Sequence, residues 1–252
     1  MREILPEAYN GKSRGPFISM FRNLINLPLA MIFPPLMILA AILALMMPRK
    51  LFRYFQVRGD EAEIASRLSA MKPYIESNDT ALDVGAGSGN FSKRVANHFD
   101  AKVSGVDIID YRDSDIEILF FDGKTLPFPD KSVDVAFAAF VLHHDKSHAN
   151  LLKEMKRVAR RKIIIFEDTF FTPWQRLFVC FNDFYSNIII GSIKALKNVG
   201  KIGIVKMPLP FTFRAIPDWI DICEAAGFTI TDVIARHDRV RPMSKVTIVL
   251  QH

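Results

Sequence analysis

Cysteine is scarce in this chain, which excludes a fold held together by disulfides. Only Cys180 and Cys223 occur among 252 residues, in apolar surroundings and without the spacing of metal ligands. Two isolated thiols are typical of a protein in a reducing compartment. The cysteines therefore predict a chain whose folded part faces the cytoplasm. The chain also has no internal repeat and no low-complexity tract.

Excess charge is missing from most of the chain, which argues against a nucleic-acid partner. The net charge is +6. Eight of the 33 Lys and Arg residues and two of the 27 acidic residues lie in residues 1–58, so residues 59–252 carry 25 charges of each sign. A nucleic-acid-binding domain shows a basic footprint. We therefore expect no nucleic acid among the partners.

Charge is absent altogether from residues 27–47, and basic residues flank them on both sides. At 1.5 Å per residue, this 21-residue segment could just cross a hydrocarbon core of ~30 Å. Each flanking Lys or Arg near an anionic membrane contributes about 1 kcal/mol to binding. The pattern predicts a hydrophobic membrane anchor with basic flanks over residues 1–58, with the membrane as a partner through residues 27–47.

Pro34 and Pro35 leave the topology of this anchor open. Proline removes a backbone donor and interrupts a helix, so only residues 36–47 remain as an unbroken apolar stretch. One topology is a kinked single span with the rest of the chain in the cytoplasm. The other is a hairpin that enters one leaflet and returns. Both tether residues 59–252 to the membrane.

A glycine-rich segment follows the first predicted strand, at residues 82–91. Gly85, Gly87 and Gly89 are spaced two residues apart, and a helix-like segment comes next. Glycine permits positive φ and lets a ligand approach the backbone, while the free N–H groups of the following helix face the turn. No Gly-Lys-Ser/Thr follows, which excludes a Walker loop, and Asn90 stands where the dinucleotide fingerprint has Gly or Ala. The segment predicts a nucleotide-type cofactor site.

Strands and helices alternate after this turn, which predicts an α/β fold. After the glycine turn, strands are predicted at residues 103–108, 118–123 and 162–166, and another begins at Val133 and ends before His143. A final hairpin is predicted at residues 228–235 and 245–250. We expect a doubly wound, Rossmann-like sheet of seven strands, mostly parallel with an antiparallel C-terminal edge. The predicted domain is 59–252, and residues 169–217 form an insertion that covers the substrate.

Four ordered motifs resemble class I S-adenosylmethionine-dependent methyltransferases, over residues 60–168. The first is D-x-G-x-G-x-G, formed by Asp83 and the three glycines. Strand ends at Asp107 and at Asp122-Gly123 follow. The fourth, LPFPDKSVDVAFAAFVLHH at residues 126–144, resembles the branch with quinone-pathway enzymes and small-molecule methylases. The resemblance implies a methyltransferase with S-adenosylmethionine as cofactor.

The resemblance also implies a role for each matching residue. The glycines admit the methionine part of the cofactor, and carboxylates bind its polar groups. The implied cofactor-binding residues are Gly85, Gly87 and Gly89; Asp83 near the amino group; Asp107 on the ribose; Ile108 beside the adenine; Asp122, followed by Gly123, at the adenine amino group; and Phe140 on the methionine side.

His143 and His144 directly follow the fourth predicted strand, and open α/β sheets bind ligands at the carboxyl ends of their strands. We expect His144 to act as a base or to orient the acceptor, with Asp145 or Asp168 as its partner. A general base contributes roughly 10²–10⁴-fold when a hydroxyl is methylated. The candidate catalytic set is His144, His143 and Asp168. Asp145 and Asp168 offer too few matched ligands for a metal, so we expect none.

Aromatic residues are concentrated between Asp168 and Pro217. Leu177, Phe181, Phe184 and Ile188 fall on one helical stripe, which either packs on the sheet or forms an apolar wall for a lipophilic acceptor. The sequence thus favours a membrane-tethered methyltransferase acting on a small lipophilic acceptor. A non-catalytic cofactor-binding or assembly protein at a membrane is the alternative, and an NAD-dependent oxidoreductase is disfavoured by Gly89 and Asn90. The oligomeric state is not predicted.

Overall fold

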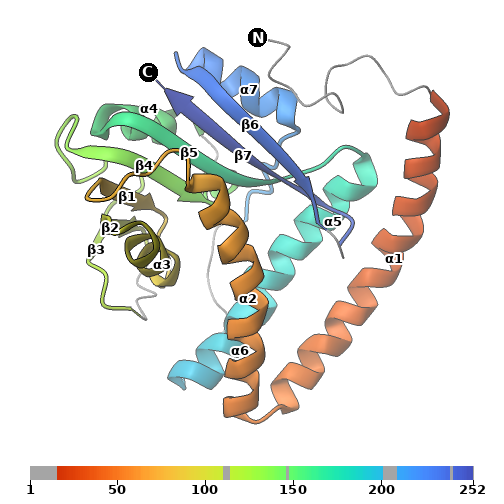
Figure 1. Ribbon diagram of the computed structural model, residues 1–252. Coiled ribbons are helices and arrows are strands. Elements are labelled where there is room, and N and C mark those ends of the chain that lie inside the picture. Colours follow the sequence, from red (N-terminus) through yellow and green to blue (C-terminus); the bar gives the residue numbers. More distant parts are fainter. Residues whose placement is uncertain (1–15, 110–113, 146–147, 201–208, 239–240, 252) are drawn as a thin grey trace.

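The protein folds as one mixed sheet between two layers of helices, with a helical extension at one side (Figure 1). The computed structural model describes residues 16–109, 114–145, 148–200, 209–238 and 241–251. For residues 16–30, 57, 59, 198 and 199 it describes the backbone alone.

The sheet has seven strands in the order β3-β2-β1-β4-β5-β7-β6. β1 to β5 run parallel, and β7 pairs antiparallel with both β5 and β6. The predicted doubly wound, seven-stranded sheet with an antiparallel C-terminal edge is confirmed. The strands are β1 (Thr80–Val84), β2 (Lys102–Asp107), β3 (Ile118–Phe120), β4 (Val133–Ala139), β5 (Ala159–Thr169), β6 (Thr229–His237) and β7 (Ser244–Gln251).

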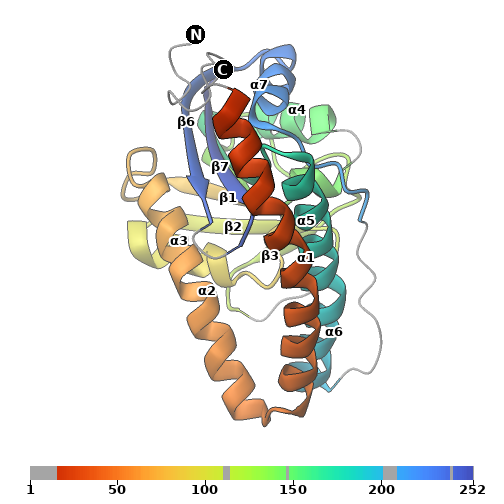
Figure 2. The same ribbon diagram turned by 90° about the vertical axis from the view of Figure 1, so that its right-hand side faces the viewer.

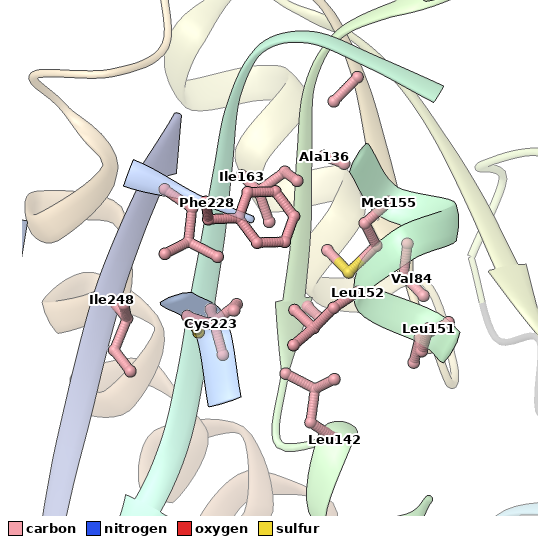
Figure 3. Close-up of a cluster of buried hydrophobic side chains, with 14 of the residues drawn as sticks. Val84, Ala136, Leu142, Leu151, Leu152, Met155, Ile163, Cys223, Phe228 and Ile248 are labelled. Atoms are coloured by element: carbon pink, nitrogen blue, oxygen red, sulfur yellow. The ribbon is translucent and has the colours of Figure 1, made fainter. Parts of the chain in front are cut away.

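Apolar side chains cover both faces of this sheet. On one face, α4 (His148–Val158) contributes Leu152 and Met155 and α7 (Ile216–Ala225) contributes Cys223 to a buried cluster (Figure 3). On the other face, α2 (Arg49–Met71) and α3 (Asn90–Phe99) pack through Met71 and Val95. Strands β1, β2 and β4 are thus buried between helices, and their carboxyl ends meet at one edge.

The N-terminal helices differ from the prediction. α1 (Pro16–Met46) continues through Pro34 and Pro35, and the chain reverses at Met47 and Pro48 instead. α2 then runs without interruption across the predicted boundary between residues 58 and 59. The predicted anchor covers residues 27–47, and the side chains of residues 27–30 lie outside the described part of the structure. Among the described residues, no helix combines the length and the apolar character needed to cross a membrane.

Residues 173–199 form one long helical segment that packs beside α1. It comprises α5 (Pro173–Phe184), the π-helical η2 (Tyr185–Ile190), α6 (Gly191–Lys194) and the π-helical η3 (Ala195–Val199). Phe33 of α1 meets Phe178 of α5 edge to face, with ring centroids 5.6 Å apart. Figure 2 shows the two helices running alongside each other. The predicted stripe is partly exposed: Leu177 and Phe184 face outward, whereas Phe181 and Ile188 are half-buried. The buried side of α5 carries Phe178, Val179 and Asp183.

Candidate active site

The glycine turn lies at the carboxyl end of β1, where the sequence predicts it. Gly85, Gly87 and Gly89 have φ of 78°, 58° and 77°, in the left-handed region. A Cβ on Gly85 would lie 2.3 Å from Cγ2 of Val141, whereas a Cβ on Gly87 would meet nothing within 4 Å. Gly87 therefore borders open space, and a ligand can approach its backbone.

Two carboxylates hold this turn. Asp83 is buried and accepts a hydrogen bond from the Ser92 hydroxyl at 2.7 Å. Burial raises the pKa of Asp83 to about 7, although the Ser92 hydroxyl and the Arg67 charge oppose the shift. Asp107 accepts the Gly87 N–H through Oδ2 at 2.7 Å and the Ile109 N–H through Oδ1 at 3.0 Å. Asp107 therefore joins the end of β2 to the glycine turn, and each oxygen keeps a second lone pair for a ligand.

The residues implied for the adenine end lie near one another on the surface. Ile108 is exposed, and its Cγ2 lies 3.4 Å from where a Cβ on Gly123 would stand. Asp122 is exposed and accepts the backbone N–H groups of Lys124 and Thr125, which lower its pKa. Asp122 is therefore a turn-forming carboxylate in the structure, and its role toward adenine stays a prediction.

A cationic and aromatic cluster borders Phe140, which has a φ of 59° at the end of β4. The Arg67 guanidinium of α2 lies 3.9 Å from the centroid of the Phe91 ring and 5.4 Å from that of Phe140. The Lys245 ammonium lies 4.6 Å from the Phe140 centroid. Burial lowers the pKa of Arg67. Sequence reasoning missed both cations, because neither belongs to a motif.

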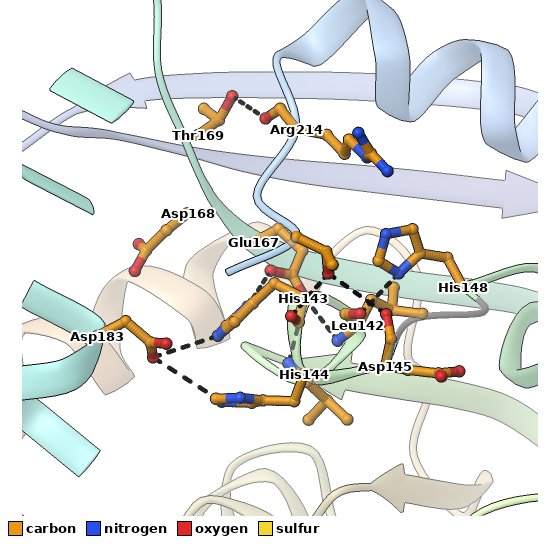
Figure 4. Close-up of polar contacts among 12 residues, drawn as sticks. Leu142, His143, His144, Asp145, His148, Glu167, Asp168, Thr169, Asp183 and Arg214 are labelled. Atoms are coloured by element: carbon orange, nitrogen blue, oxygen red, sulfur yellow. Dashed lines mark hydrogen bonds and ion pairs between the residues drawn. The ribbon is translucent and has the colours of Figure 1, made fainter. Parts of the chain in front are cut away.

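His143 is held between two carboxylates (Figure 4). Its Nδ1 lies 2.6 Å from Glu167 Oε2, and its Nε2 lies 3.5 Å from Asp183 Oδ1; all three side chains are buried. Burial disfavours the charged ring, but Glu167 and Asp183 outweigh this effect and raise the pKa of His143 to about 10. Glu167 and Asp183 therefore favour the protonated form of His143.

His144 is the more accessible histidine of the pair. Its Nε2 lies 3.9 Å from Asp183 Oδ1, and its side chain is 16% exposed. The two histidine rings lie 4.1 Å apart, in the short helix η1 (Leu142–His144) after β4. His144 therefore lies at the same edge of the sheet as the glycine turn.

The carboxylate beside His144 differs from the prediction. Asp183 of α5 approaches it, whereas Asp168 is half-buried with its Oδ1 3.7 Å from Lys245 Nζ, and loss of hydration raises the pKa of Asp168. Successive residues of a strand point to opposite faces, so Glu167 faces His143 and Asp168 does not. The structure thus places Asp183 beside His144, and the expectation of Asp145 or Asp168 as its partner stays a prediction. The sequence holds one signal for Glu167. It forms a pair of acidic residues with Asp168, directly after the Ile-rich strand predicted at residues 162–166.

Comparisons with known proteins agree with this site. Residues 82–166, which run from β1 into β5, match the family described as "Methyltransferase domain". The 27-O-demethylrifamycin SV methyltransferase of Amycolatopsis mediterranei is 31% identical over 110 residues. That alignment covers 38% of this chain and 40% of the relative, so the likeness spans less than half of either protein.

Solved structures share the fold. An S-adenosylmethionine-dependent methyltransferase from Aquifex aeolicus has a TM-score of 0.50 at 19% identity, over 72% of this chain and 87% of its own. The cyclase SpnF has a TM-score of 0.53 at 14% identity, over 74% and 79%. The family match shows a methyltransferase domain within residues 82–166, and the solved structures share its fold, which supports the predicted S-adenosylmethionine cofactor.

Proposed function

We propose that this S-adenosylmethionine-dependent methyltransferase methylates a small lipophilic acceptor while it is bound to a membrane surface, with the catalytic domain on the cytoplasmic side. The observation that carries the catalytic part is the open backbone at Gly87, at the same sheet edge as His144. The unpaired thiols Cys180 and Cys223 support the cytoplasmic side.

The cofactor is proposed to lie along the glycine turn. Asp107 would accept from its ribose hydroxyls and Asp83 from its amino group, while Ile108 and Gly123 lie where the adenine would be. Arg67, beside Phe91 and Phe140, is suited to a negative charge such as a carboxylate. When bound, S-adenosylmethionine supplies an already activated methyl group. Holding an acceptor in line with that methyl group supplies ~7–11 kcal/mol of barrier lowering.

His144 is the proposed acceptor-orienting residue. Its side chain is partly exposed and has Asp183 beside it, so it can hold a hydroxyl of the acceptor and take its proton. The Amycolatopsis relative is named for 27-O-demethylrifamycin SV, and this name specifies an oxygen. We therefore favour an oxygen acceptor.

The exposed side of α1 supports attachment to a membrane. No charged residue occurs from Met31 to Met47, and large apolar side chains there face outward. Contiguous exposed apolar surface marks interaction sites, and a helix of this kind can lie within one leaflet without crossing it. The exposed residues are Met31, Ile32, Leu36, Ile38, Leu39, Ile42, Leu43, Leu45 and Met46.

Basic side chains at the start of α2 complement this apolar surface. Lys50, Arg53 and Arg58, with Tyr54 and Glu61, line an open hollow of ≈ 450 Å³. Cations at this position favour anionic headgroups, at about 1 kcal/mol each. The turn between α1 and α2 therefore joins an apolar helix to a basic one, as a surface-bound hairpin requires.

The helix α5 links the proposed membrane surface to the reaction site, which supports a lipophilic acceptor. One side of α5 packs against α1 through Phe178, another exposes Trp174, Leu177 and Phe184, and its inner side holds Asp183 beside His144. The exposed apolar side of α5 would thus contact an acceptor that moves from the bilayer to His144.

Calorimetric titration of the full chain in lipid nanodiscs with S-adenosylhomocysteine tests the cofactor site. We expect micromolar binding, no binding of NAD, and loss of binding in Asp107→Ala. Asp221→Ala, an exposed carboxylate on α7, is the matched control and should bind like the wild type. Absence of binding, or a preference for NAD, would overturn the proposal. Binding without methyl transfer to any lipid fraction would favour a non-catalytic assembly protein.

A further inference from the structure

We propose that His143, His144 and Asp183 form a binding site for one divalent transition-metal ion. Each residue offers one ligand atom, and the three atoms lie within 4.8 Å of one another. Nε2 of His143 and Nε2 of His144 lie 3.5 Å and 3.9 Å from Oδ1 of Asp183. Ligands at ~2.1 Å around a tetrahedral zinc ion lie about 3.4 Å apart, so small side-chain rotations would close the site.

Two further residues contact the side chains of the proposed ligands and hold them in place. Glu167 Oε2 lies 2.6 Å from Nδ1 of His143, which leaves Nε2 of that ring facing Asp183. The Asn187 side chain donates to Asp183 Oδ1 at 2.6 Å. A carboxylate that holds the far nitrogen of a ligating histidine fixes the ring and raises its basicity as a ligand.

An independent observation also points to a cation. Asp183 is buried, yet its Oδ2 has no hydrogen-bond partner among the described residues. A buried carboxylate oxygen without a partner is costly. A metal ion bound by Oδ2 together with Oδ1 would satisfy this oxygen.

The ligand types narrow the choice of metal. Two imidazoles and one carboxylate suit Zn²⁺, Fe²⁺, Co²⁺ or Ni²⁺, whereas Mg²⁺ and Ca²⁺ prefer an all-oxygen shell. Three protein ligands leave a position open for an exogenous oxygen. The partly exposed side chain of His144 marks the accessible side of the site.

The open position gives the ion a role that rests on the proposed function. A hydroxyl or enol oxygen of the acceptor bound to the ion would pass its proton to solvent water more readily, without His144 as the base. His144 would then orient the acceptor as a metal ligand. The metal site itself depends only on the three side chains and is testable without any acceptor.

Metal binding is measured on the full chain in nanodiscs after dialysis against EDTA. Zn²⁺ and Co²⁺ are titrated by calorimetry, Mg²⁺ is the comparison ion, and the visible spectrum of the Co²⁺ form reports nitrogen ligation. We expect about one equivalent of Zn²⁺ or Co²⁺ and at least tenfold weaker binding of Mg²⁺. Asp183→Asn and His144→Gln should each weaken Co²⁺ binding at least tenfold and change its spectrum.

His98→Gln, an exposed histidine on α3, is the matched control and should leave Co²⁺ binding unchanged. Circular dichroism and S-adenosylhomocysteine affinity report whether each variant is folded. Co²⁺ binding that survives in both ligand variants, or that His98→Gln abolishes, would overturn the metal site. Wild-type protein that binds S-adenosylhomocysteine but neither metal would also overturn it and leave the proposed function standing. Metal binding without S-adenosylhomocysteine binding would contradict the proposed function alone.

Discussion

Nδ1 of His143 lies 2.6 Å from Oε2 of Glu167, and both side chains are buried. The second oxygen of Glu167 accepts the N–H groups of Val141 and Leu142, at 3.1 Å and 2.8 Å. One carboxylate at the end of β5 therefore fixes both the backbone of η1 and the ring of His143. The position of His144 depends on this arrangement, because it is the next residue of the same short helix.

Glu167→Gln should weaken both stability and catalysis. The amide removes the buried negative charge and presents a second donor toward His143, at a cost of about 1–3 kcal/mol in unfolding free energy. The substitution should also shift η1, which carries His144. Methyl transfer should therefore fall at least tenfold, while the affinity for S-adenosylhomocysteine stays unchanged. Denaturant unfolding and turnover check this, with Glu76→Gln, an exposed residue in the loop between α2 and β1, as control. A variant as stable and active as the wild type would remove Glu167 from this role.

His144→Gln should lower turnover with a hydroxyl acceptor at least tenfold. Glutamine keeps a polar side chain at this position but offers no imidazole, while the cofactor contacts at the glycine turn are untouched. Steady-state kinetics and calorimetry with S-adenosylhomocysteine separate the two effects. A rate equal to the wild type would exclude His144 from the reaction.

Cofactor affinity should depend on pH through Asp83, whose pKa burial raises to about 7. Below that pH the carboxyl group is neutral and loses its attraction for the positive amino group of the cofactor, and above it the carboxylate is ionised. S-adenosylhomocysteine should therefore bind more weakly as pH falls from 8 to 6. Calorimetry over this range checks the trend, and Asp83→Asn should bind weakly at every pH. If the affinity of the wild-type protein stays the same from pH 6 to pH 8, the role assigned to Asp83 is contradicted.

Gly87→Ala should damage cofactor binding more than stability. Alanine at this positive φ costs ~1–2 kcal/mol, but its Cβ enters open space where the cofactor is proposed to lie. Gly200→Ala is a matched control, because Gly200 also has a positive φ and open space around its Cβ position. Both variants should unfold at similar denaturant concentrations, and only Gly87→Ala should lose S-adenosylhomocysteine affinity. Equal affinity in the two variants would place the cofactor elsewhere.

The double variant Leu39→Ser and Leu43→Ser should weaken vesicle binding at least tenfold. Both side chains are more than half exposed, so the fold loses little, whereas burial of one leucine in lipid contributes about 1.5–3 kcal/mol. Co-sedimentation with anionic and zwitterionic vesicles measures the effect, and Leu119→Ser at the exposed edge strand β3 is the control. Unchanged binding to both vesicle types would rule out α1 as the contact.

The sheet was predictable because its information is local. The glycine turn, the carboxylates at strand ends and the runs of buried β-branched residues each lie within a few residues of one another. β5 extends further than predicted, to Ala159–Thr169, and Arg160 and Arg161 near its start pair with Asp134 and Asp79 on neighbouring segments. Such pairs between distant segments leave no periodic signal in the sequence.

The course of the N-terminal helices and the carboxylate beside His144 were not predictable from local sequence. The two prolines predict a break at residues 34–35, yet α1 continues through them, and its inner side packs on α5 through Phe33 and Met37. Asp183 reaches His144 only because α5 folds back over the end of β4. A tertiary contact of this kind has no counterpart in local spacing, so His144 was predicted without the carboxylate that lies beside it.

The most direct test of the central claim is methyl transfer itself. The full chain in vesicles containing total lipid extract is incubated with methyl-labelled S-adenosylmethionine, and the label in the organic phase is counted. We predict label that depends on the wild-type protein and falls at least tenfold in Asp107→Ala and His144→Gln, but not in Asp221→Ala. A protein that binds S-adenosylhomocysteine yet transfers no label to any lipophilic fraction would contradict this account.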